Sequence, residues 1–258
     1  MDAPHISTIA MTFPGDMRLD VRLCPGNEDR LLRVTARWRD DSGAPADLEP
    51  NATVSDLGAR FLAGVDAGLF HGPKEGQRAE LLHTSTRTDG QGEYTDEWEM
   101  RTPPLDADAF AVLARMIWST GAVELTIVQN APDARLTIHS LDLSPRTDRV
   151  PPWEVLNHEG NEKDVMVTVA FEHDAPPEIV RATHATLKAW ADVVAAGGFP
   201  ARSFPISGAL LSELGTELES EVFASFEALS VRREGWAALW SGLQRIHSRA
   251  RIERVEIG

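Results

Sequence analysis

The residues of this chain with the clearest chemical potential are the histidines and glutamates of its first half. His83 and His139 lie in segments where apolar and polar residues alternate, so both are predicted to lie in β-strands. Two histidines that face each other across a sheet can ligate zinc or exchange a proton. No H-x-H or H-E-x-x-H pattern accompanies either residue. A solvated or hydrogen-bonded histidine is therefore the alternative interpretation, and we favour it.

Glu97, Glu99 and Arg101 occupy alternate positions of one predicted strand, so they share a face of it. Two carboxylates can act as acid and base when one of them is desolvated. The same alternation is typical of any solvated sheet face, which favours a structural interpretation. We therefore assign no catalytic residue. The candidate ligand-binding residues are His83, Glu97, Glu99, Arg101 and His139.

The remaining motifs indicate turns and caps rather than chemistry. The glycine-rich segments 71–76 and 89–92 match neither a P-loop nor a dinucleotide fingerprint, and no serine stands in a G-x-S-x-G pattern. Asp174 precedes two prolines, where a helix-capping acid is common. Cys24 is the only cysteine, which excludes an intrachain disulfide and a thiolate metal cluster. We predict no cofactor and no metal.

Composition narrows the function further. Hydrophobic residues make up 42% of the 258 residues and charged residues 25%, as in folded domains. The formal net charge of −15 argues against nucleic acid and against an anionic membrane surface. No apolar run reaches the length of a membrane span and the N-terminus lacks a secretory pattern, so a cytoplasmic location is expected. Arginine far outnumbers lysine, which suggests a bacterial source.

The elements that must position these residues follow one order twice: strand, helix, strand, strand, helix, strand. An additional strand at Leu19–Leu23 is expected to form a hairpin with the strand at 32–38, and another is expected at Arg135–Leu143. Residues 1–18 show no clear period. The predicted elements of the first half are 32–38, 54–69, 79–87, 93–101, 106–120 and 123–130, and those of the second half are 165–171, 177–196, 208–212, 221–229, 234–249 and 251–257.

Matching residues in the two halves support a tandem duplication. The offsets between matched residues stay between 126 and 133, close to half the chain length. The matches are Val34 with Val167, Phe70 with Phe199, Leu81-Leu82 with Leu210-Leu211, Trp98 with Phe226, and Phe110 with Trp236.

The order of elements predicts an α+β fold made of two ferredoxin-like βαββαβ units, each an antiparallel sheet with helices on one face. The predicted boundaries are 1–145 for the first unit, 146–163 for a linker and 164–258 for the second unit. In the first half the strand at 93–101 has one polar face, which can meet water. In the second half both faces of the strand at 221–229 are partly apolar, so that sheet is expected to be covered on both sides.

Two classes of function remain. The first is a non-enzymatic protein-binding module whose acidic surface engages a basic protein, for instance as an antidote that neutralises a basic toxin domain. The second is an enzyme or small-ligand binder with its pocket between the two units. We favour the first, because the charge is −15 and no catalytic constellation stands out.

Overall fold

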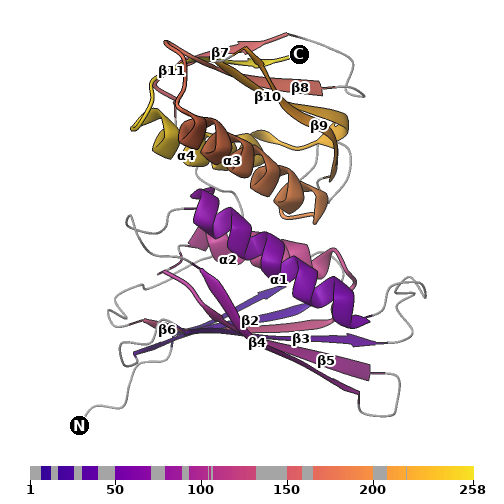
Figure 1. Cartoon of the computed structure of the whole chain (residues 1–258). Coiled ribbons are helices and arrows are strands. Elements are labelled where there is room, and N and C mark those ends of the chain that lie inside the picture. The colour runs from indigo at the N-terminus through magenta and orange to yellow at the C-terminus, as the bar shows by residue number, and fades with distance from the viewer. Residues whose placement is uncertain are drawn as a thin grey trace. The chain divides into compact units, whose positions relative to one another are not determined.

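The computed structural model describes twelve stretches of the chain: residues 7–12, 17–25, 31–39, 50–70, 79–88, 93–103, 105, 107–131, 150–158, 165–199, 208–218 and 220–258. The chain divides into two compact units. The first holds residues 1–66 and 72–143, and the second holds residues 67–71 and 144–258. Figure 1 shows the helices and strands of both units.

The first unit contains a six-stranded sheet in the order β1-β2-β6-β3-β5-β4. Its last four strands have the order of a ferredoxin-like sheet, because β6 and β5 flank β3 and β4 follows β5. Its elements are β1 (Ser7–Thr12), β2 (Arg18–Pro25), β3 (Leu31–Arg39), α1 (Pro50–Ala67), β4 (Glu80–Thr88), β5 (Glu93–Arg101), α2 (Ala107–Trp118) and β6 (Glu124–Ala131).

Both helices of this unit cover the same face of its sheet (Figure 1). Strand β3 alternates cleanly, and its buried row ends at Trp38, which is 1% exposed. The Trp38 Nε1–H donates a hydrogen bond to Thr120 Oγ1 at 2.9 Å, which joins the strand to the turn after α2. A Cβ on Gly58 of α1 would lie 3.9 Å from the Trp98 ring, so this helix passes close over β5. The core is therefore the layer between the sheet and the two helices.

The second unit contains a five-stranded sheet in the order β7-β11-β8-β10-β9. Without β7, this is again the ferredoxin-like order. Its elements are β7 (Glu154–Asn157), β8 (Val165–Phe171), α3 (Pro177–Ala195), β9 (Gly208–Leu218), β10 (Glu221–Ser230), α4 (Arg233–His247) and β11 (Ile252–Ile257).

Aromatic side chains dominate the helix-covered side of the second sheet. Trp190 of α3 lies edge-on to Phe226 of β10, with 5.6 Å between the ring centroids. Its Nε1–H donates to the Gly235 carbonyl at 2.8 Å, which ties α3 to the start of α4. Trp236 and Trp240 stack along α4 with their centroids 5.9 Å apart. Large aromatic areas buried in this way supply much of a small core.

The tandem duplication of a ferredoxin-like unit is confirmed, and the repeat is longer than predicted. In each unit a further strand precedes the βαββαβ order and pairs parallel with the last strand: β2 with β6, and β7 with β11. These parallel pairs make the sheets mixed, where the sequence predicted antiparallel sheets. Gly68 and Gly197, which follow the first helix of each unit, also share a positive φ of 76° and 77°.

Two matches between the halves disagree with each other by two residues. Val34 lies opposite Trp98 in the first sheet, whereas Phe226, the match of Trp98, lies opposite Val165. Val34 therefore corresponds to Val165 if Trp98 corresponds to Phe226, and to Val167 if Trp98 corresponds to Ala224. A shift of two residues keeps every side chain on its own face of the strand, so the alternation could not reveal the error.

The pairing predicted for the N-terminal strands is also corrected. The expected hairpin between Leu19–Leu23 and 32–38 does not form, because β6 lies between β2 and β3. Strand β2 instead joins the outer edge of β6 in parallel and pairs on its other side with β1. Strand β1 itself lies in the stretch 1–18, where no element was predicted.

The segment predicted as a linker contains β7. The indole of Trp153, which precedes this strand, is 6% exposed and lies against Trp240 and His247. This segment is therefore part of the second sheet where the structure describes it. The strand predicted at Arg135–Leu143 lies outside the described residues. Strand β9 begins where predicted, at Gly208, and runs on to Leu218.

The left-handed backbone at Gly197 yields a stability prediction. Because a Cβ is strained at a φ of 77°, Gly197→Ala should lower the free energy of unfolding by about 1 kcal/mol. Gly208→Ala is the matched control, since no atom lies within 4 Å of a Cβ added there. Urea unfolding of both variants measures the difference. Equal stability of the two variants would show that the backbone at Gly197 is not strained.

Candidate functional site

The outer face of the first sheet, opposite the helices, carries the charged residues of its strands. In β3 the buried row is Leu32, Val34, Ala36 and Trp38, so Arg33, Thr35, Arg37 and Arg39 point to the other side. In β5 the same alternation places Glu93, Thr95, Glu97, Glu99 and Arg101 on this face. Its side chains are half-buried or exposed, so they are accessible for binding.

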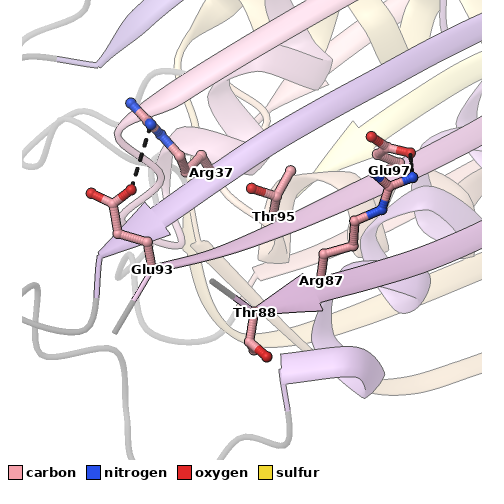
Figure 2. Close-up of a pocket in the computed structure, with 6 residues that line it drawn as sticks. All are labelled: Arg37, Arg87, Thr88, Glu93, Thr95 and Glu97. Carbon is pink, nitrogen blue, oxygen red and sulfur yellow. Dashed lines mark hydrogen bonds and ion pairs between the residues drawn. The ribbon is translucent and has the colours of Figure 1, made fainter. Parts of the chain in front are cut away.

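A pocket of about 400 Å³ lies on this face and is centred on Thr95 (Figure 2). Thr95 pairs with Arg37 of β3 on one side and with Arg87 of β4 on the other. Glu93 and Glu97 stand two positions before and after it along β5. A short threonine surrounded by four long side chains leaves a depression at its centre. Thr88 at the end of β4 completes the lining.

Ion pairs hold the walls of the Thr95 pocket. Arg37 contacts Glu124 at 2.7 Å and Glu93 at 3.5 Å, and Arg87 contacts Glu97 at 3.4 Å. The Nε of Arg37 is buried without a hydrogen-bond partner. Half-exposed pairs at these distances contribute about 0–1 kcal/mol each. A ligand can therefore exchange them for its own contacts at small cost.

Four of the five residues named from the sequence lie on this outer face. Glu97 lines the Thr95 pocket. Glu99 accepts a hydrogen bond from Arg33 Nε at 3.1 Å and lies opposite His83 in the sheet. Arg101 pairs with Glu80 at 3.0 Å. His139 lies outside the described residues.

Charges on the outer face of the first sheet nearly cancel. Its residues on β2 follow from the parallel pairing of β2 with β6, which sets Arg18, Asp20 and Arg22 beside the outward row of β6. Across the described strands seven arginines meet six acidic residues: Arg18, Arg22, Arg33, Arg37, Arg39, Arg87 and Arg101 against Asp20, Glu80, Glu93, Glu97, Glu99 and Glu124. The acidity of the chain therefore does not come from this face.

The outer face of the second sheet has a different composition. The helix-covered row of β10 is Val222, Ala224 and Phe226, so Glu221, Phe223 and Ser225 point outward. Met166 on β8 is 43% exposed on this side, opposite Ser225. The half-buried ring of Phe223 lies over Gly215, where a Cβ would approach it to 2.8 Å. Met166 and Phe223 thus form an apolar centre. Among the described residues of this unit, no helix or strand covers this outer face, where the sequence predicted cover on both sides.

Acidic residues surround that apolar centre. Four glutamates lie on this face by their strand register: Glu221, Glu256 of β11, Glu213 of β9 and Glu154 of β7. Arg254 is the one base that the described strands of this sheet place beside them. Arg254 contacts Glu256 at 2.5 Å, Glu221 at 3.1 Å and the adjacent Glu253 at 3.3 Å. The hydrogen bond to Glu256 and these charges raise the pKa of Arg254. Carboxylates therefore outnumber cations on this face.

A buried carboxyl lies on the opposite, helix-covered side of the first sheet. Asp96 is 2% exposed, and its Oδ1 accepts a hydrogen bond from the Thr86 hydroxyl at 2.5 Å. Its Oδ2 has no partner. Burial raises the pKa of Asp96, and the Thr86 hydrogen bond offsets part of that rise. Thr95 and Glu97 flank it in sequence but face the other way, so Asp96 does not reach the Thr95 pocket.

Sequence reasoning missed most of the pocket. Arg37 and Arg87 lie beside Thr95 because of the way β3 and β4 pair with β5. This pairing register could not be deduced from the sequence. The alternation along β5 gave the face of Thr95 but not its neighbours. Asp96 carried a usable signal, because an aspartate stands in the row between Tyr94 and Trp98 that the helices bury.

The described part of the chain shows neither a metal-binding cluster nor a membrane-spanning helix. No group of three or more histidine, cysteine, aspartate or glutamate residues in it is arranged to hold a metal ion. None of its helices is long and apolar enough to cross a membrane.

Comparison with known proteins gives the chain no family. No protein-family model matches it, and no curated protein shows significant similarity. Among solved structures, an unknown protein from Galdieria sulphuraria is 12% identical over 89% of this chain and 96% of its own, with a TM-score of 0.24. The regulatory subunit of aspartate kinase from Thermus thermophilus is 12% identical to this chain. The match covers 84% of this chain and 93% of the subunit, with a TM-score of 0.23.

A third solved structure is the first half of the periplasmic protease PqqL from Escherichia coli. It is 9% identical to this chain. The match covers 88% of this chain and 68% of the protease fragment, with a TM-score of 0.26. At these scores the likenesses carry no inference about what this chain binds or does.

The buried carboxyl yields a prediction about pH. Because the pKa of Asp96 is higher in the folded chain than its ordinary 3.8, its contribution to stability is full below pH 3.8 and is lost as the pH rises through the folded pKa. Asp96→Asn should therefore raise the free energy of unfolding at pH 7, by about 1 kcal/mol, and remove this pH dependence.

Urea unfolding between pH 4 and pH 8 measures the effect. Asp56→Asn is the control, because the side chain of Asp56 is 53% exposed, and a change of less than about 0.5 kcal/mol is expected there. An Asp96→Asn variant that is less stable than the wild type at pH 7 would contradict the assignment.

Proposed function

We propose that this chain is a non-enzymatic binding protein that engages a basic protein through the outer face of its second sheet. The observation that carries the proposal is the pairing of an apolar centre, Met166 and Phe223, with surrounding acidic residues. Protein interfaces commonly join an apolar core to a charged rim. A methionine that is 43% exposed can serve as the anchor, because its flexible side chain adapts to a partner.

The charge distribution supports a basic partner. Glu154, Glu213, Glu221 and Glu256 share this face with one cation, and Arg254 is already held by three carboxylates. A basic partner meets an unbalanced negative surface here, whereas on the first sheet it meets arginines as often as acids. The chain's net charge of −15 adds long-range attraction that speeds the encounter. Neutralisation of a basic toxin domain is one role of this kind.

One observation favours a second, small-ligand role. The Thr95 pocket lies within the first unit and is lined by arginine, glutamate and threonine. The sequence predicted a small-ligand pocket between the two units. The Thr95 pocket lies elsewhere, on the outer face of the first sheet. The two surfaces belong to different units of the chain, and either role stands without the other.

Capture of basic proteins from a lysate of the source organism tests the protein-binding role. We expect the wild-type chain to retain one or a few basic proteins at low salt and to release them at high salt, because ions screen the surface charges. Met166→Arg should abolish this capture, because it places a positive charge in the apolar centre, where that charge repels a basic partner. Quantitative mass spectrometry of the eluted proteins provides the measurement.

The matched control is Thr126→Arg, which adds the same charge to the outer face of the first sheet. This variant should capture the same proteins as the wild type. A second variant, Glu213→Arg, should weaken capture by reversing one rim charge. The proposal fails if Met166→Arg captures the wild-type set, if the captured proteins are not basic, or if they resist high salt.

A further inference from the structure

The Thr95 pocket combines two opposite charges in a fixed geometry. The strand register sets Arg37 and Arg87 on either side of Thr95, across the strands, while Glu93 and Glu97 stand before and after it along β5. Neighbouring strands are about 5 Å apart, so the two arginine Cα atoms lie about 10 Å from each other. Positions two apart along a strand are separated by about 7 Å, so the two glutamates stand about 13 Å apart. Figure 2 shows the charged groups as two pairs around one hydroxyl, with Arg37 and Glu93 on one side of Thr95 and Arg87 and Glu97 on the other.

This arrangement discriminates between ligands by charge. A simple anion between the arginines would also meet Glu93 and Glu97, and a simple cation near the glutamates would meet the arginines. A molecule that carries both charges can pair with an arginine and with a glutamate at the same time. The lining contains two arginines and two glutamates, so a ligand with no net charge leaves the balance of the pocket unchanged.

Each wall of the pocket has groups left to bind such a ligand. Each guanidinium offers five donors in all, and the ion pairs of Arg37 and Arg87 use only some of them. The Arg87–Glu97 contact is long, at 3.4 Å, and its two side chains are 72% and 41% exposed. Such a pair opens readily. The hydroxyl of Thr95 adds a donor and an acceptor at the centre.

We infer that the Thr95 pocket binds a small zwitterion of amino-acid to dipeptide size, which carries one carboxylate and one ammonium group. The carboxylate lies across the Thr95 hydroxyl toward Arg37 and Arg87, and the ammonium lies toward Glu93 or Glu97. The volume of about 400 Å³ falls in the range of small-molecule sites. This inference does not depend on the binding of a basic protein at the second sheet.

Isothermal titration calorimetry on the full chain tests the inference. The probes are the twenty amino acids and glycylglycine, and each ligand that binds is compared with the matching acid that lacks the amine and the matching amine that lacks the carboxylate. We expect at least one zwitterion to bind and both of its one-charge analogues to bind about 10- to 100-fold more weakly. The same ligand should raise the melting temperature.

Three variants locate the site. Thr95→Leu fills the centre of the pocket and Arg87→Gln removes one arginine, so each should weaken binding about 10-fold or more. Thr126→Leu is the matched control, because Thr126 is a half-buried threonine of the same outer face on β6 and does not line the pocket. It should bind like the wild type. Melting temperatures without ligand show that each variant is folded.

Three results would overturn the inference: no zwitterion binds at millimolar concentration, a one-charge analogue binds as tightly as the zwitterion, or folded Thr95→Leu and Arg87→Gln both bind like the wild type. None of these results tests the capture of a basic protein by the outer face of the second sheet, so the two proposals can fail separately.

Discussion

In the part of the chain that the structure describes, each sheet has helices on one face alone, and the rest of the structure depends on that constraint. The covered rows, such as Val34, Ala36 and Trp38 in β3, are nearly inaccessible to water. A fully buried apolar side chain of this size contributes about 1.5–3 kcal/mol, whereas an exposed ion pair contributes about 0–1 kcal/mol. Stability is therefore concentrated on one side of each sheet, and the other side is free to take on binding chemistry.

The two units use this freedom differently. The first open face pairs its charges across neighbouring strands, so arginines and acidic residues nearly cancel and a pocket remains where a short threonine interrupts them. The second open face replaces most charges at its centre with Met166 and Phe223 and keeps an acidic rim. The two duplicated units thus have the same arrangement of core elements but unlike outer surfaces. We expect the surface charge of the first unit to favour small polar ligands and that of the second to favour a protein.

Local patterns in the sequence predicted most of the fold, and long-range pairing accounts for the errors. Alternation and helical periodicity placed the helices and the core strands, because those patterns belong to each segment alone. The parallel strands β2 and β7 were not predicted to join β6 and β11, since such partners lie about 100 residues apart. Candidate residues followed the same division. The outward face of Glu97, Glu99 and Arg101 was predictable, whereas the arginines beside Thr95 became visible only through the register. The charge of −15 indicated an acidic surface but not its position.

The place of the last strand has a consequence for synthesis of the chain. Strand β11 lies inside the second sheet, between β7 and β8, although it follows every other element of that unit in sequence. The sheet of the second unit therefore stays divided until residue 257 has left the ribosome. The described strands of the first unit have all emerged once residue 131 has left the ribosome, because β6 is the last of them in sequence. The sheet formed by these strands of the first unit can thus fold during translation, while β7 stays apart from β8, β10 and β9 until β11 joins them.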